Sequence, residues 1–126
     1  ARNNADRLGA PVDFVCTEAL EAWKGAFDAV VSNPPYVGGE ELDGLQREVR
    51  NFEPPVALIG NGDPLDLYRR LCSQAHERLV EGGALVVEIG YSMEKAIRNL
   101  FHSGWELLPT RNDLQGIPRV IAARKR

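Results

Sequence analysis

Four consecutive residues, Asn33-Pro34-Pro35-Tyr36, are suited to holding a planar amino group. An asparagine side chain has one acceptor oxygen, and proline lacks a backbone N–H while its carbonyl can still accept a hydrogen bond. The Asn33 amide oxygen and the Pro34 carbonyl could therefore accept both hydrogens of an NH2 group, with Tyr36 as a flat wall over the substrate. The simpler alternative is that these residues form only a rigid turn.

Methyl transfer from a sulfonium fits this arrangement. The leaving thioether is neutral, so the main task is to align a weak nitrogen nucleophile with the methyl group. Two acceptors on the N–H groups also offset the charge that develops on the nitrogen. No Ser-His-Asp or Cys-His pattern competes, because His76 and His102 are expected on helices, at the surface or a helix end. Cys16 and Cys72 fit no metal-ligand spacing and are predicted to be small core residues.

The elements around the motif predict an α/β fold. The apolar run 27–31, directly before Asn33, is typical of a parallel strand covered on both faces. Other strands are predicted at 12–15, 84–89, 105–108 and 120–123, and helices at 40–50, from Pro64 to a stop at Gly82-Gly83, and at 93–101. Strands that alternate with helices imply a mostly parallel sheet, and the last two strands are predicted to form an antiparallel hairpin at its edge.

In such sheets the ligand crevice lies at the carboxyl ends of the strands. This rule selects the segment that begins with Asn33 and the segment that begins with Glu88. Glu88 could line a substrate pocket, or it could be a strand-end carboxylate satisfied by backbone N–H groups. We therefore expect the two segments to share one site.

The bulk composition indicates one ordinary globular domain over residues 1–126, with 44% hydrophobic and 26% charged residues. The net charge of −3 argues against nucleic acid as the main partner, since phosphate-binding proteins are usually basic. Neither a signal peptide nor an apolar run long enough to span a bilayer is visible, so a cytoplasmic protein without a membrane partner is predicted.

The chain resembles the C-terminal part of the catalytic domain of the release factor glutamine methyltransferases, the HemK/PrmC family. The resemblance lies in 27–37 with the Asn-Pro-Pro-Tyr signature, in the strand 83–90 and in the hairpin signature 113–120. It also includes shorter segments at 1–5, 48–49, 52–54, 57–58, 60–63 and 67–69. It implies a Rossmann-like class I methyltransferase sheet and transfer of a methyl group from S-adenosylmethionine to the N5 amide nitrogen of a glutamine. That glutamine belongs to a Gly-Gly-Gln loop of a peptide chain release factor, and S-adenosylhomocysteine is the other product; no metal is implied.

The resemblance also assigns roles to residues of this chain. Asn33 is expected to bind the glutamine amide and the methionine end of the cofactor, and Pro34 to accept through its carbonyl. Pro35 is expected to shape the turn and Tyr36 to pack on the substrate. Glu18 and Ala19 fall near the position of the adenine, although the family commonly has an aromatic residue where Ala19 stands.

The sequence departs from the pattern of a complete cofactor site, because it has no G-x-G-x-G run. We expect that loop, the ribose-binding acid and the first strands of the sheet to lie upstream. The chain by itself is then expected to bind the cofactor weakly or not at all, and to expose one side of its sheet. Two alternatives stay open at this point: an adenine-N6 or guanine-N2 methyltransferase of nucleic acids, and a non-catalytic partner domain.

Overall fold

The computed structural model describes residues 1–34 and 63–126. The elements in chain order are α1 (Arg2–Leu8), β1 (Phe27–Ser32), α4 (Pro64–Arg78), β2 (Leu79–Glu88), α5 (Glu94–Arg98), β3 (Trp105–Leu107), β4 (Arg111–Asn112) and β5 (Pro118–Lys125). Pro35, Tyr36 and the predicted helix 40–50 lie outside the described residues.

The strands form one mixed sheet in the order β1-β2-β5-β3, with β4 also paired to β5. β1 is parallel to β2, whereas β5 is antiparallel to β2, β3 and β4, so β5 alone of these strands opposes the common direction. The predicted antiparallel pairing of the last two long strands is confirmed. However, β5 lies inside the sheet between β2 and β3, so of these two strands only β3 is at an edge. The short strand β4 was not predicted.

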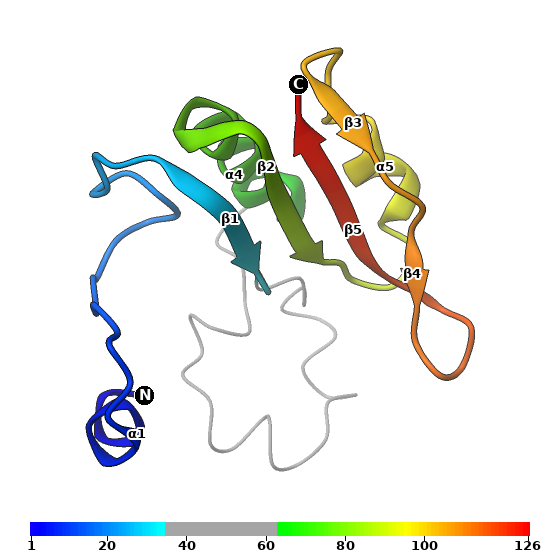
Figure 1. The fold of residues 1–126 in the computed structure, drawn as a ribbon. Helices are drawn as coiled ribbons and strands as arrows, with labels where there is room; N and C mark the ends of the chain where they lie inside the picture. Colours follow the sequence, from blue (N-terminus) through cyan, green and yellow to red (C-terminus); the bar gives the residue numbers. More distant parts are fainter. Residues whose placement is uncertain (35–62) are drawn as a thin grey trace.

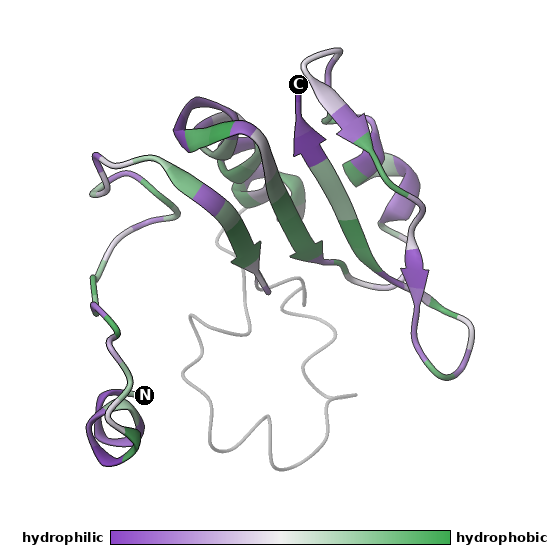
Figure 2. Cartoon of the chain, in the orientation of Figure 1, coloured by the Kyte–Doolittle hydropathy of each residue, from purple (hydrophilic) through white to green (hydrophobic). Residues whose placement is uncertain are grey.

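Two helices cover one face of this sheet, α4 over β2 and α5 over β5 (Figure 1). The core between them consists mainly of residues from β2, β5 and α4. Fully buried examples are Leu85 and Val87 on β2, Ile121 on β5 and Tyr68 on α4. Figure 2 shows apolar residues toward the carboxyl ends of β1 and β2 and in the amino-terminal half of β5, whereas the carboxyl end of β5 is polar.

The helix α4 begins where Pro64 predicted and ends earlier than expected. Asp63 caps it, because its Oδ1 accepts a hydrogen bond from the Leu65 N–H at 2.9 Å. The prediction that Gly82-Gly83 stops the helix was wrong: Leu79 is already extended and pairs with Phe27 of β1. Pairing with β1 begins at Leu79 and resumes at Ala84 after an irregularity, so the chain leaves the helix without a glycine.

The region before β1 differs most from the sequence-based expectation. Residues 12–15 form no strand, and Val12 and Val15 are about half exposed. Cys16 is exposed as well, not a core residue. Val31 is 77% exposed, so β1 is covered on one face only. The physical reason is that no described helix packs closely on β1 and no described strand pairs with its outer edge, so these apolar residues have little to pack against.

Two smaller differences concern α5 and the residues after it. The predicted helix 93–101 is shorter, from Glu94 to Arg98, with Ile97 buried as expected. His102 follows this helix and is exposed, and its ring lies edge-on to His76 of α4 at 4.6 Å between centroids. Among the described residues, no helix combines the length and the apolar character needed to cross a membrane.

Candidate functional site

The carboxyl end of β1 places Asn33 and Pro34 beside the end of β2. Ser32 and Val87 are the last Cα partners of the parallel ladder, so the next residues, Asn33 and Glu88, leave the two strands side by side. Asn33 is exposed and Pro34 is buried. A buried proline restricts the backbone immediately after the exposed amide, which suits a side chain that must present its oxygen in a fixed direction.

The end of β2 is held from two sides. Glu88 is the last residue of the strand and is half-buried, and its main-chain oxygen accepts a hydrogen bond from the Tyr68 hydroxyl at 2.9 Å. The next residue, Ile89, donates its N–H to the carbonyl of Arg119 at 2.9 Å. The strand end therefore has one hydrogen bond from α4 and another to β5, and its position relative to Asn33 is restrained by both.

The sequence predicts a buried face of α4 at Leu67, Leu71, Ala75 and Leu79, and this set leaves out Tyr68. The structure leaves Leu67 half-buried and buries Tyr68 completely. The signal was present, because 68, 72, 75 and 79 follow helical spacing as closely as the predicted set does. A tyrosine on an apolar helix face also needs a partner for its hydroxyl, which could have directed attention to a nearby strand end.

The turn after β2 exposes an aromatic side chain at the same edge. Tyr91 is 73% exposed. Ser92 has a φ of 60°, an uncommon value for a residue with a side chain, and Met93 donates its N–H to the Gly90 carbonyl at 3.3 Å. The chain thus reverses sharply after Gly90 and leaves Tyr91 facing solvent.

The hairpin between β4 and β5 is organised around one carboxylate. Asp113 Oδ1 accepts hydrogen bonds from the N–H groups of Gln115 at 2.9 Å and Ile117 at 3.0 Å, and Oδ2 accepts one from Arg119 Nε at 3.1 Å. These bonds, with that from Ile117 as the largest cause, lower the pKa of Asp113 below its usual value. Since Arg119 also accepts from Ile89, the hairpin is connected directly to the end of β2.

Glu18 and Ala19 lie beside α4. Glu18 Oε2 pairs with Arg70 Nη1 at 2.7 Å, and the neighbouring Leu20 donates its N–H to Gln74 Oε1 at 2.8 Å. Ala19 has a φ of 47° in the turn between them. Among the predicted site residues that the structure describes, Asn33, Pro34 and Glu88 lie together at the carboxyl ends of β1 and β2. Glu18 and Ala19 lie beside α4, where Glu18 pairs with Arg70.

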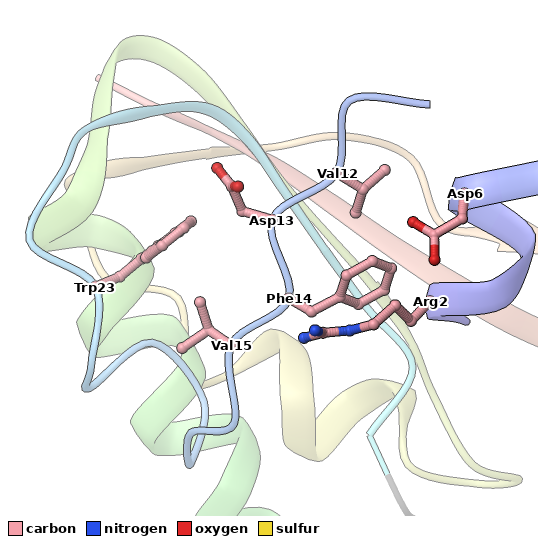
Figure 3. A pocket seen from close by; sticks show the side chains of 7 residues that line it. All are labelled: Arg2, Asp6, Val12, Asp13, Phe14, Val15 and Trp23. Atoms are coloured by element: carbon pink, nitrogen blue, oxygen red, sulfur yellow. The ribbon is translucent and has the colours of Figure 1, made fainter. Parts of the chain in front are cut away.

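A pocket of about 520 Å³ lies in the amino-terminal part of the chain (Figure 3). Its walls combine charged and apolar side chains, and the Arg2 guanidinium lies over the Phe14 ring at 5.4 Å. It is lined by Arg2, Asp6, Val12, Asp13, Phe14, Val15 and Trp23. None of these lining residues is a predicted site residue.

The described residues contain no group of three or more His, Cys, Asp or Glu side chains placed to hold a metal ion. Cys72 is buried, as predicted, and burial raises the pKa of its thiol to about 12. A thiol of that kind is a poor nucleophile near neutral pH, since only the thiolate reacts. Cys72 therefore acts as a core residue.

Sequence comparison relates the chain to curated proteins named release factor glutamine methyltransferase. It is 44% identical to the protein of Bradyrhizobium diazoefficiens over 99% of this chain, 42% identical to that of Koribacter versatilis over 99%, and 40% identical to that of Geobacter sulfurreducens over 98%. The resemblance inferred from the motifs is confirmed. The chain spans 43%, 45% and 44% of the length of these relatives, and it matches their C-terminal part. No protein-family model matches the chain.

Solved structures give the same fold. TrmN from Thermus thermophilus aligns over 98% of this chain and 32% of its own, with a TM-score of 0.66 and 19% identity. A methyltransferase from Pyrococcus furiosus aligns over 98% of this chain and 55% of its own, with a TM-score of 0.61 and 16% identity. The predicted class I methyltransferase fold is therefore confirmed.

Proposed function

We propose that this chain is the substrate-holding part of a release factor glutamine methyltransferase, a single partial catalytic domain that transfers a methyl group to the N5 nitrogen of a glutamine side chain. The observation that carries the proposal is the exposed Asn33 amide at the carboxyl end of β1, followed by buried Pro34 and next to Glu88. The relative of this name from Bradyrhizobium diazoefficiens is 44% identical across 99% of the chain. A peptide chain release factor is then the protein substrate.

The roles follow from the chemistry of an amide nucleophile. The Asn33 side-chain oxygen and the Pro34 carbonyl accept the two hydrogens of the substrate NH2 group, and Tyr36 packs on the glutamine side chain. Pro35 shapes the turn, and Glu88 borders the substrate. As the new N–CH3 bond forms and the S–CH3 bond breaks, the nitrogen releases one proton to water. The two acceptors align the lone pair and offset the developing positive charge.

S-adenosylmethionine supplies the methyl group and leaves as S-adenosylhomocysteine. Asn33 is placed to contact the methionine part of the cofactor, because its side chain is exposed directly after the carboxyl end of β1. Glu18 fits the adenine side less well, since its carboxylate is already paired with Arg70. The chain has no G-x-G-x-G run. We therefore propose that most contacts with the cofactor come from the part of the protein that corresponds to the remaining length of the relatives. We also propose that no metal takes part.

We further propose that the protein acts in the cytoplasm on a protein rather than on nucleic acid, in keeping with its net charge of −3. The decisive experiment uses the full-length protein that contains this chain, a purified bacterial release factor and isotopically labelled S-adenosylmethionine. Label is expected in the release factor, and mass spectrometry should place one added methyl group on the glutamine of the Gly-Gly-Gln loop.

The matched control is a release factor with that glutamine replaced by glutamate, which removes the acceptor nitrogen and should abolish labelling. Label in DNA or RNA but none in the release factor would overturn the proposal in favour of a nucleic-acid methyltransferase. If the full-length protein fails to bind S-adenosylmethionine in calorimetry, the chain is better described as a non-catalytic partner domain.

A further inference from the structure

We propose that Tyr68 is a positioning residue of the methyl-transfer site, acting through the end of β2. The inference rests on the proposed function and extends it to a residue outside the Asn-Pro-Pro-Tyr signature. Tyr68 lies on α4 and is completely buried, and its hydroxyl donates a hydrogen bond to the Glu88 main-chain oxygen at 2.9 Å.

The place of this bond on the strand is what connects it to the site. The parallel ladder between β1 and β2 has its last partners at Ser32 and Val87. Glu88 lies one residue further on, beside Asn33, where the two strands no longer hold each other by this ladder. Tyr68 thus supplies a hydrogen bond at the point where Glu88 must keep its place next to the exposed amide of Asn33.

The helix that carries Tyr68 is itself anchored near its start. Asp63 Oδ1 caps the helix by accepting from the Leu65 N–H, and Asp63 Oδ2 and the Asp66 carboxylate both accept from Arg69 Nη1. Arg69 directly follows Tyr68 in the helix, and its Nη1 lies 2.8 Å from Asp63 Oδ2. The capped first turn and the buried ring together restrict the movement of the hydroxyl. Its hydrogen bond can therefore hold the Glu88 main-chain oxygen in a fixed position.

The opposite end of the same strand offers a matched control. Lys125 Nζ donates a hydrogen bond to the main-chain oxygen of Leu79, the first residue of β2, also at 2.9 Å. Both bonds join a side-chain donor to a main-chain acceptor on β2, and they differ in which end of the strand they hold. A purely structural role predicts similar consequences for the loss of either bond, whereas a positioning role predicts a kinetic effect for Tyr68 alone.

The test compares Tyr68→Phe and Lys125→Met in the full-length protein, using initial rates of release factor methylation with S-adenosylmethionine varied up to saturation. Tyr68→Phe keeps the buried ring and is expected to lower kcat about tenfold, with little change in the KM for the cofactor. Lys125→Met should leave kcat unchanged. Melting temperatures of both variants are measured alongside, so that a loss of folded protein is separated from a slower reaction.

Equal kcat values for Tyr68→Phe and wild type would overturn the inference while leaving the proposed function intact. The same holds if both variants lose activity in proportion to their loss of stability. If wild-type protein transfers no methyl group to the release factor, the proposed function itself fails, and the two failures are thus distinguished. Should Tyr68→Phe fold poorly, Tyr68→Trp, which keeps a buried donor group, must recover more activity than Tyr68→Leu for the inference to stand.

Discussion

Ser32 of β1 and Val87 of β2 are Cα partners at the end of a parallel ladder, and this pairing aligns the two segments that carry the candidate site. Because parallel strands end on the same edge, the residues that follow, Asn33 and Glu88, emerge together. The pairing explains how two segments more than fifty residues apart in the chain contribute to one place.

Asn33→Ala in the full-length protein should lower kcat for release factor methylation by about 10²- to 10³-fold, since it removes an acceptor that aligns the nucleophile. The side chain is exposed, so the melting temperature should hardly change. Asn99→Ala, at another exposed asparagine beyond α5, is the matched control and should retain full activity. Full activity of Asn33→Ala would contradict the proposed role of Asn33 in the site.

Gly83→Ala should destabilise the fold by about 1–3 kcal/mol, because a Cβ there would lie 2.8 Å from the Val80 carbonyl oxygen and 3.2 Å from that of Asp28. Both neighbours are backbone atoms at the irregular start of the ladder between β1 and β2, so neither can move away easily. Urea denaturation measures the effect. Gly25→Ala is the control, since a Cβ there meets nothing within 4 Å, and equal midpoints for the two variants would contradict the packing argument.

Asp113→Asn should destabilise the protein at neutral pH and have less effect in acid. The native hydrogen bonds, above all that from Ile117, lower the pKa of the Asp113 carboxyl below its usual 3.8. A lowered pKa contributes stability that is present above pH 3.8 and is lost as the pH falls through the lower native value.

The measurement is the urea midpoint of wild type and Asp113→Asn across the acid range. The difference between them is expected to shrink as the pH drops below about 4. Arg119→Lys keeps the positive charge but removes the Nε donor, so it should destabilise the protein less than Asp113→Asn does at neutral pH. A difference that stays constant with pH would show that the charge of Asp113 is unimportant.

The two cysteines should react very differently with a thiol reagent. Cys16 is exposed, whereas Cys72 is buried with a thiol pKa of about 12. At about pH 8, one thiol should therefore react rapidly in the native chain, and the second only after denaturation. Peptide mapping identifies the modified residue. Rapid labelling of Cys72 without denaturant would contradict its placement in the core.

The sequence by itself predicted the proposed chemistry and determined most of the local structure. The Asn33–Pro34 pair, the apolar runs of β1, β2 and β5, and the start of α4 at Pro64 all depend on residue type and short-range spacing, which act in any context. The family resemblance had the same origin, since it lies in motifs that can be read directly from the chain.

Other features were decided only by the tertiary structure. Whether the helix before β2 ends at Arg78 or at Gly82 depends on pairing with β1, and whether Cys16 is buried depends on a neighbour for the outer edge of that strand. The bond from Tyr68 to Glu88 joins a helix to a strand end twenty residues away. Such contacts arise from how elements pack, and periodicity within one element carries no information about them.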